Sequence, residues 1–376
     1  MGLNEAQKKA VEEIKKNVIV NAGAGTGKTS VLTKRYIQIL EKGNLEEGKE
    51  IESIVAITFT EKATQEMIDR IRKAIRENFS NGSKWRNLYR DLEKANISTI
   101  HSFCARILRE CPIEANVDPN FKVLEKYQSE RLLKESIKEV LIKGVNEDER
   151  VYKLLLAFGK DDINSLVKDL LSVYDKIRTV GIGFRELKDK VINQLNDFKL
   201  CNDDLTKIKD DMQYLMDNIR GRSKISSLKN NEIWAKFKED KYAEEELPDI
   251  LKILYDNLGI NKKEQEKIDS LKETIIKVLL CFEKNNLEIY ETVLDLLIDI
   301  DGIYEAKKKE LGALDFEDLQ LKVSKLLDNE IIRKRYQDKF KYIMIDEFQD
   351  VNELQKDIFY KLTSVNEKLD KSNLFV

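Results

Sequence analysis

The chain has 376 residues, a formal net charge of −3 and 36% charged residues. This length favours two or more compact units, and the acidic total argues against a protein that coats nucleic acid non-specifically. Many Lys, Glu, Leu and Ile, with only 3 Pro and 15 Gly, favour a helix-rich globular protein.

The first predicted element is a short, β-branched apolar strand at residues 17–22, and the sequence AGAGTGKT follows at 22–29. A glycine-rich turn between a strand and a helix that ends in Gly-Lys-Thr predicts a phosphate-binding loop. Its backbone N–H groups and the helix N-terminus face an anion. Lys28 is expected to reach the β- and γ-phosphates, and Thr29 to ligate Mg²⁺. Ala22 stands where the strict pattern has Gly, at a position that needs only a small residue.

Two further apolar runs predict strands at residues 53–60 and 95–100. The stretch 62–109, which overlaps the second run, carries 11 Lys and Arg against 5 Asp and Glu. A local basic stretch can bind phosphate even when the whole chain is acidic. A solvated helix face accounts for the same charges equally well.

The four cysteines are far apart and form no C-x-x-C pair, and the chain has a single histidine. These residues do not fit a zinc site of the usual kind, so we expect reduced thiols. His101 and Cys104 stand close in sequence. No oxyanion or orienting group accompanies them, which disfavours a nucleophile pair.

Strand-like runs are absent between about residues 120 and 310, where Leu, Lys and Glu recur with helical spacing. A polar, loop-like segment at 218–240 divides this helical part. Strand patterns return at 342–346 and 373–376. The chain therefore predicts one α/β domain with a parallel sheet, made from both ends of the chain and interrupted by an all-helical insertion.

Asp346 and Glu347 end the predicted strand that begins at residue 342. Asp346 is placed to hold Mg²⁺, and Glu347 to orient or deprotonate an attacking water. An Asp-Glu pair alone is common at surface turns. At the end of a buried strand, in a chain with a phosphate-binding loop, it is much more specific.

These motifs resemble those of superfamily 1 DNA helicases of the UvrD/Rep group, in the order in which that group carries them. The segments similar to the Q motif and to motifs I, Ia, Ib, Id and II are residues 3–7, 22–29, 57–67, 98–104, 314–319 and 346–350. The resemblance implies a RecA-like P-loop NTPase domain at 1–116 and 310–376, with a helical insertion subdomain at 117–309. The bound cofactors would be ATP and Mg²⁺.

The resemblance also implies roles for individual residues. Gln7 pairs with the adenine edge, and the nucleotide is bound by Ala22, Gly23, Ala24, Gly25, Thr26, Gly27, Lys28 and Thr29. The metal is held by Thr29 and Asp346, and the catalytic residues are Lys28, Asp346, Glu347 and Gln349, of which Gln349 couples hydrolysis to DNA binding. The DNA-binding residues are Thr58, Phe59, Thr60, Lys62 and His101. A core aromatic for Phe59 and a structural hydrogen bond for His101 remain alternatives.

Ser30 stands where UvrD and Rep usually carry Arg, and the segments TFTEKAT and TIHSFC are closer to the AddA/RecB branch, which processes double-strand breaks. The sequence ends at Val376, on the strand expected to lead into motif III. Motifs III to VI, a second RecA-like domain and any nuclease domain would lie outside it. We therefore expect an N-terminal portion that is nearly inactive alone.

The expected function is that of an ATP-dependent 3′→5′ DNA helicase in DNA repair or recombination. Its expected partners are single-stranded DNA, duplex junctions, the C-terminal helicase half and a possible nuclease subunit. No apolar run is long enough for a membrane span, and no leader pattern is present, so a cytoplasmic location is expected. The alternatives are a regulatory P-loop ATPase switch and an inactive scaffold within a helicase–nuclease complex. The intact Lys28, Thr29, Asp346 and Glu347 argue against the scaffold.

Overall fold

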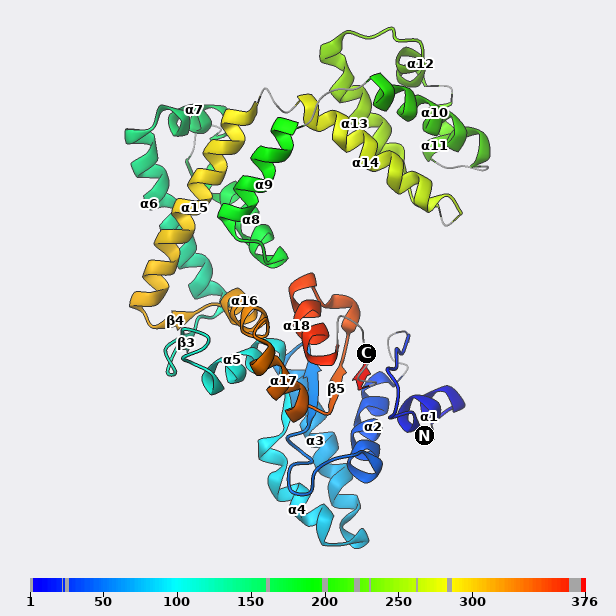
Figure 1. Cartoon of the computed structure of the whole chain (residues 1–376), viewed down its shortest axis with the longest axis vertical. Coiled ribbons are helices and arrows are strands. Elements are labelled where there is room, and N and C mark those ends of the chain that lie inside the picture. The colour runs from blue at the N-terminus through cyan, green and yellow to red at the C-terminus, as the bar shows by residue number, and fades with distance from the viewer. Residues whose placement is uncertain are drawn as a thin grey trace. The chain divides into compact units, whose positions relative to one another are not determined.

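The computed structural model describes residues 3–21, 23, 27–159, 163–197, 202–219, 224–229, 231–261, 263–282, 286–364 and 373–376. The chain divides into two compact units (Figure 1). Unit 1 comprises Met1–Ser136, Leu171–Gly181 and Gly302–Val376, and unit 2 comprises Ile137–Leu170 and Ile182–Asp301. These divisions fall at other residues than the predicted boundaries at 117 and 309, which stay a prediction.

Unit 1 is built on a parallel sheet with the strand order β2-β1-β5-β6. The strands are β1 (Ile54–Thr58), β2 (Asn96–Thr99), β5 (Tyr342–Ile345) and β6 (Leu374–Phe375). The backbone N–H of Val18 donates to the carbonyl of Leu374 at 2.9 Å, so the predicted strand at 17–22 adjoins β6 through a single bridge. The predicted α/β domain with strands from both ends of the chain is confirmed.

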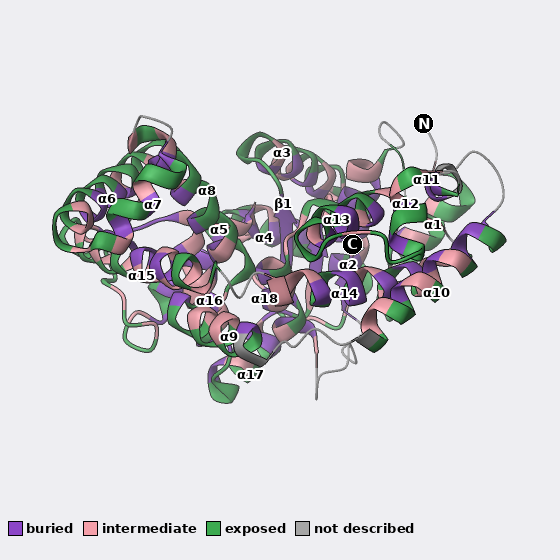
Figure 2. Ribbon diagram, turned by 90° about the horizontal axis from the view of Figure 1, so that it is seen from above, coloured by how far each residue is buried: buried purple, intermediate pink, exposed green. Residues whose placement is uncertain are grey.

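The sheet is buried on both faces. All five residues of β1 are buried. Because side chains alternate along a strand, Val55 and Ile57 enter one apolar core, whereas Ile54 and Ala56 enter the other. Figure 2 shows β1 in the buried colour. A parallel sheet with both faces covered needs continuous apolar strands, which is the pattern that these runs have.

Helices from both ends of the chain contribute to the two cores. The helices on the side of Val55 are α5 (Ile100–Glu110), α16 (Phe316–Leu326), α17 (Glu330–Lys339) and α18 (Glu353–Thr363). Those on the side of Ala56 are α1 (Glu5–Glu12), α2 (Lys28–Lys42), α3 (Glu61–Glu77) and α4 (Ser83–Asp91). Short 3₁₀ turns are η1 (Phe79–Asn81), η2 (Leu92–Lys94) and η5 (Phe348–Asp350). The covered sheet leaves one edge, where the strands end, for binding.

A second, two-stranded parallel sheet was not expected from the sequence. It pairs β3 (Lys122–Val123) with β4 (Ala313–Leu314). The N–H of Lys122 donates to the carbonyl of Gly312 at 2.9 Å. Two-residue strands carry too few positions to show an alternating pattern, so periodicity does not reveal them.

In its described residues, unit 2 contains helices and no strand, which agrees with the predicted all-helical insertion. The helices that extend from unit 1 into unit 2 are α6 (Lys126–Glu147), α8 (Ile163–Val180) and α15 (Leu287–Glu310). The others are α7 (Glu149–Phe158), α9 (Phe184–Asp197), α10 (Asn202–Asn218), α11 (Lys224–Leu228), α12 (Glu232–Lys238), η3 (Glu244–Glu246), α13 (Leu247–Asn257) and α14 (Gln265–Phe282). No described helix is both long and apolar enough to cross a bilayer.

The interpretation of residues 218–240 as a loop-like divider was wrong. Helices α11 and α12 lie within this segment, among its described residues. Ile225, Leu228, Trp234 and Phe237 are buried in the apolar core of unit 2. The many polar residues between them occupy the outer sides of short helices, which hid the helical spacing.

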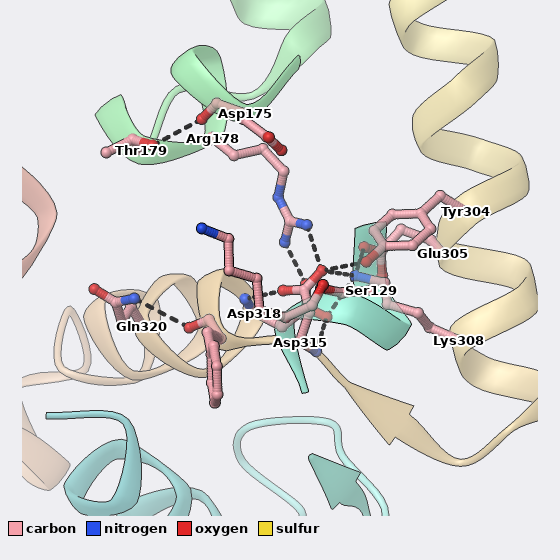
Figure 3. Close-up of polar contacts among 12 residues, drawn as sticks. Ser129, Asp175, Arg178, Thr179, Tyr304, Glu305, Lys308, Asp315, Asp318 and Gln320 are labelled. Atoms are coloured by element: carbon pink, nitrogen blue, oxygen red, sulfur yellow. Dashed lines mark hydrogen bonds and ion pairs between the residues drawn. The ribbon is translucent and has the colours of Figure 1, made fainter. Parts of the chain in front are cut away.

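Four buried charges connect separate helices within unit 1. Arg178 of α8 donates to Asp315 at 2.7 Å and to Asp318 at 2.5 Å. Lys308 of α15 lies 3.1 Å from Asp315 and also contacts Asp318. The Tyr304 hydroxyl donates to Asp315 at 2.9 Å. Arg178, Lys308, Asp315 and Asp318, called the ionic cluster below, point toward one another in Figure 3, and none exposes more than 7% of its side chain.

The ionic cluster affects the protonation of its members. Burial pushes the pKa of Asp315 upward, but the charges of Arg178 and Lys308 outweigh it and hold that pKa well below its usual range. A carboxylate with a lowered folded-state pKa contributes stability above its unfolded pKa of about 3.9, and loses it as the pH falls toward the folded value.

We predict that Lys308→Met lowers the free energy of unfolding by about 3–5 kcal/mol, because it leaves buried carboxylates with one cation too few. Urea denaturation at pH 7 measures this change. The difference from wild type should shrink below about pH 4 as Asp315 takes up a proton. Lys153→Met, which breaks an exposed pair with Glu149, is the control and should change little. An equally small effect of Lys308→Met would contradict the prediction.

Candidate functional site

Three strands end at one edge of the sheet in unit 1, and the predicted site residues follow them. Thr58 ends β1 opposite Thr99, which ends β2. Past the end of β5, the N–H of Asp346 donates to the carbonyl of Ile57 at 2.9 Å. Ligands of parallel α/β sheets bind at the carboxyl ends of the strands. The sheet therefore gathers the predicted ATP and DNA motifs along the edge where ligands are expected.

The phosphate-binding loop leads into helix α2, which begins at Lys28 after the N-cap Gly27. Gly27 has a φ of 88°, in the left-handed region where glycine avoids steric strain. The first turn closes through its carbonyl, which accepts from the N–H groups of Ser30 and Val31. Gly23, Gly27, Lys28 and Thr29 are described. Four loop residues lie outside the described residues: Ala22, Ala24, Gly25 and Thr26.

Gln7 lies beside this loop. Asn4 caps helix α1 by accepting from the N–H of Gln7 at 2.8 Å, and the Gln7 side-chain oxygen accepts from the N–H of Asn4 at 3.0 Å. A Cβ added at Gly27 would stand 3.6 Å from Nε2 of Gln7. The capping box therefore fixes the Gln7 amide next to the loop. Its pairing with adenine stays a prediction.

The centre of the site is an ion pair between the two principal ATPase motifs. Nζ of Lys28 lies 2.7 Å from Oε2 of Glu347, and Gln349 donates to the same oxygen. Glu347 adopts a left-handed backbone conformation (φ 51°), which is uncommon for a residue other than glycine and clusters at functional sites. The hydrogen bond from Lys28 lowers the pKa of Glu347 and raises the pKa of Lys28. The predicted base is thus held ionised, with its charge balanced by the predicted phosphate ligand.

Asp346 is half-buried beside this pair. Burial, followed by the charge of Glu347, raises the pKa of Asp346. A pocket of about 310 Å³ is lined by residues that include Lys28, Asp346 and Glu347. A nearby cation would favour the ionised form of Asp346.

A magnesium ion fits the oxygen donors of this site. Mg²⁺ is usually held by one or two protein oxygens together with substrate phosphates and water. Asp346 and the hydroxyl of Thr29 are such donors. The described residues contain no group of three or more His, Cys, Asp or Glu suited to a metal ion. A metal at this pocket would therefore be shared with the nucleotide.

The segment after β1 presents an aromatic ring and a lysine to solvent. Phe59 is 64% exposed, so the alternative of a core aromatic is wrong. Lys62 and Thr60 are also exposed, and Thr60 caps helix α3 by accepting from the N–H of Ala63 at 3.1 Å. Thr58 is buried, and its hydroxyl lies 2.6 Å from that of Thr64. Thr58 therefore supports the loop from within, and its predicted DNA contact stays a prediction.

His101, in the first turn of α5, stacks on Phe316 with ring centroids 4.4 Å apart and planes at 25°. Burial lowers the pKa of His101, and the charge of Glu61 opposes the shift. The Glu61 carboxylate accepts from the hydroxyls of Thr99 at 3.0 Å and Ser102 at 3.2 Å. We did not single out Glu61 or Phe316 from the sequence, although both lie within the quoted motifs. Their roles depend on contacts between segments far apart in the chain.

Two weaker sequence signals have simpler explanations. Cys104 is buried, and burial raises the pKa of its thiol well above the usual range, so it is unsuited to act as a nucleophile with His101. In the basic stretch 62–109, exposed charges pair along helix surfaces, which favours the solvated face. These pairs are Arg70–Glu66, Arg72–Asp69 and Lys94–Asp91.

Comparison with known proteins agrees with this geometry. The UvrD/REP helicase N-terminal domain family matches residues 3–376. The chain is 29% identical over 443 residues to the AddA-type ATP-dependent helicase/nuclease protein of Listeria welshimeri, with 100% of this chain and 35% of that protein covered. Proteins of the same name from Ligilactobacillus salivarius and Natranaerobius thermophilus are 27% and 28% identical, covering 99% and 96% of this chain.

The chain spans about a third of the length of these relatives. They confirm the lean toward the AddA side of the group. The match over nearly every residue confirms the resemblance that the motifs indicated. This chain belongs to the UvrD/REP helicase N-terminal domain family.

Proposed function

We propose that this chain is the N-terminal, ATP-binding portion of an ATP-dependent 3′→5′ DNA helicase or translocase that acts in DNA repair or recombination. The observation that carries the proposal is the Lys28–Glu347 ion pair at a pocket on the sheet edge. The exposed Phe59 follows a strand of the same edge. One edge therefore serves both an ATPase site and a DNA surface. The polarity and the repair role rest on the family and on the relatives' names.

The ion pair supplies a way to control hydrolysis. In this structure, Lys28 neutralises Glu347. A triphosphate carries more negative charge than one carboxylate, and the N-terminus of α2 also attracts it, so the phosphates take over Lys28. Glu347, still contacted by Gln349, is then released to orient or deprotonate the attacking water. A Mg²⁺ ion held by Thr29 and Asp346 would neutralise charge that develops on the phosphates.

The backbone bond from Asp346 to Ile57 connects this chemistry to DNA. Asp346 directly precedes the base Glu347, and Ile57 directly precedes Thr58 and Phe59. A rearrangement at the end of β5 on nucleotide binding would be felt at the end of β1. We propose that single-stranded DNA contacts Phe59, Thr60, Lys62 and His101 on this edge, and that ATP hydrolysis changes this contact.

The remaining partners are proposed on the relatives' names and on the resemblance. These partners are duplex junctions, a C-terminal helicase half and a nuclease subunit. An inactive scaffold is disfavoured, because Lys28, Asp346 and Glu347 meet in one pocket with Thr29 next in sequence. A regulatory ATPase switch would hydrolyse ATP without regard to DNA, which separates it from the proposed motor.

We predict that Lys28→Ala abolishes the thermal stabilisation of the chain by ATP and Mg²⁺, because ligand stabilisation requires binding to the folded state. Differential scanning fluorimetry measures the melting temperature with and without nucleotide. The matched control is Lys34→Ala, an exposed lysine of the same helix, which should keep the full shift. An unchanged shift in Lys28→Ala would mean that ATP binds elsewhere.

We predict weak, salt-sensitive binding of single-stranded DNA that depends on Phe59 and Lys62. Phe59→Ala should cost about 1–3 kcal/mol of binding free energy if a base stacks on the ring. Lys62→Ala should reduce the slope of log affinity against log salt by about 0.7, the value for one lost phosphate contact. Fluorescence anisotropy with a labelled oligothymidine measures both, and Lys73→Ala, an exposed lysine also on α3, is the control. If both variants titrate like wild type at low salt, the DNA surface lies elsewhere.

We predict little DNA-stimulated ATP hydrolysis and no unwinding by this chain alone. Among the described residues that line the pocket, Lys28 is the only cation, whereas an arginine finger contributes about 10³–10⁵ in rate. Joining the chain to the C-terminal part of a homologous protein should restore stimulation, and Glu347→Gln should remove it again. Phosphate release with and without single-stranded DNA measures this. Strong stimulation of the 376-residue chain by itself would refute the proposed division of catalytic groups.

A further inference from the structure

The ionic cluster surrounds the start of helix α16. Asp315 is the N-cap of this helix and accepts from the N–H of Asp318 at 2.8 Å, while the Asp318 carboxylate accepts from the N–H of Asp315 at 3.0 Å. Phe316 is the first residue of the helix, between the two aspartates. The same carboxylates that cap α16 are those that bind Arg178 and Lys308 (Figure 3). The backbone that carries Phe316 is therefore fixed from two other helices.

Capping alone does not require this arrangement. A solvent-exposed Asn or Ser caps a helix well, as Asn352 does for α18 in a capping box with Gln355. Burying four charges is expensive, and such clusters are weak evidence for stability. Their physical advantage is directional, because a planar guanidinium and two carboxylates satisfy one another in few geometries. The cluster thus sets the position and direction of the first turn of α16.

The side chain placed by this turn reaches the sheet edge. The ring of Phe316 stacks on His101 at 4.4 Å. His101 lies in the first turn of α5, whose N-cap Thr99 ends β2. Arg178 and Lys308 belong to helices that enter unit 1 from residues of unit 2. The chain of contacts runs from these two helices, through the aspartates and Phe316, to the histidine.

We propose that the ionic cluster is a positioning device for the His101–Phe316 stack at the strand edge, and that Arg178, Lys308, Asp315 and Asp318 are its positioning residues. The inference deepens the proposed function, because it assigns to the ends of α8 and α15 the alignment of a group on the DNA-binding edge. These residues act on His101 only through Phe316. They are not catalytic residues.

The single histidine of the chain makes this proposal directly observable. In a sample with ¹³C-labelled histidine, one imidazole signal reports the ring current of Phe316, which shifts the protons of a stacked neighbour. Phe316→Leu removes the ring but keeps an apolar side chain, and it defines the signal of an unstacked His101. The test variant combines Lys308→Met with Asp318→Asn. This pair of changes removes one charge of each sign and leaves Arg178 with Asp315.

We expect the His101 signal of the double variant to move most of the way from the wild-type position to that of Phe316→Leu. The control combines Lys277→Met with Asp204→Asn, the same exchange at an ion pair of unit 2, and should keep the wild-type signal. Circular dichroism verifies that each variant is folded. A folded double variant with the wild-type His101 signal would overturn the proposal.

Should the double variant not fold, Tyr304→Phe tests the same point more gently, because it deletes only the hydroxyl that donates to Asp315. The signal should move in the same direction by a smaller amount, and an unmoved signal would overturn the proposal. Oligothymidine titration of the same variants tests the DNA role separately. A shifted signal with unchanged DNA affinity would uphold the positioning device and refute the DNA contact of His101.

Discussion

The parallel pairing of β1 with β5 is the interaction on which the site depends. It places Met344 beside Ala56 and Ile345 beside Ile57, so the residues that follow the two strands emerge together. The chain between them is folded as a largely helical excursion, and the pairing closes it. Through it, Lys28 and Glu347, which are 319 positions apart in the sequence, come within 2.7 Å. Because both faces of the sheet are covered, binding is confined to the edge where the strands end.

Two ionic arrangements in unit 1 have opposite characters. Lys28 and Glu347 expose 25% and 36% of their side chains, so water and phosphate reach them and the pair can exchange partners. The ionic cluster exposes at most 7% of any member, which excludes such exchange. The first suits a site that changes state during hydrolysis. The second suits a fixed support behind the edge, because a buried charge that lost its partner would be strongly destabilising.

Much of the α/β domain was predictable, because its strands are continuous apolar runs and its loop has a motif with a mechanism. The strands at 53–60, 95–100 and 342–346 were found to within two residues at each end. The β3–β4 pair was not predictable, since two residues show no period. The helices within 218–240 were missed, because polar residues masked the spacing of a few buried apolar ones.

The site was predictable by residue type but not by contact. Lys28 and Glu347 were singled out, but their pairing with each other follows only from the fold. Thr58 looked like a surface hydroxyl, yet the last position of a buried strand turns it inward. Arg178 and Lys308 stand in helical segments crowded with other charges, and no local pattern distinguishes a buried charge from a solvated one. Their role depends on partners in α16, which only tertiary structure supplies.

The central claim is that nucleotide takes Lys28 away from Glu347. A crystal structure of this chain with Mg²⁺ and a non-hydrolysable ATP analogue tests it most directly. We expect Nζ of Lys28 on the β- and γ-phosphate oxygens, the metal shared by Thr29, Asp346 and the phosphates, and Glu347 turned toward a water near the γ-phosphate. Nucleotide bound in the pocket with the Lys28–Glu347 pair still intact would contradict the mechanism.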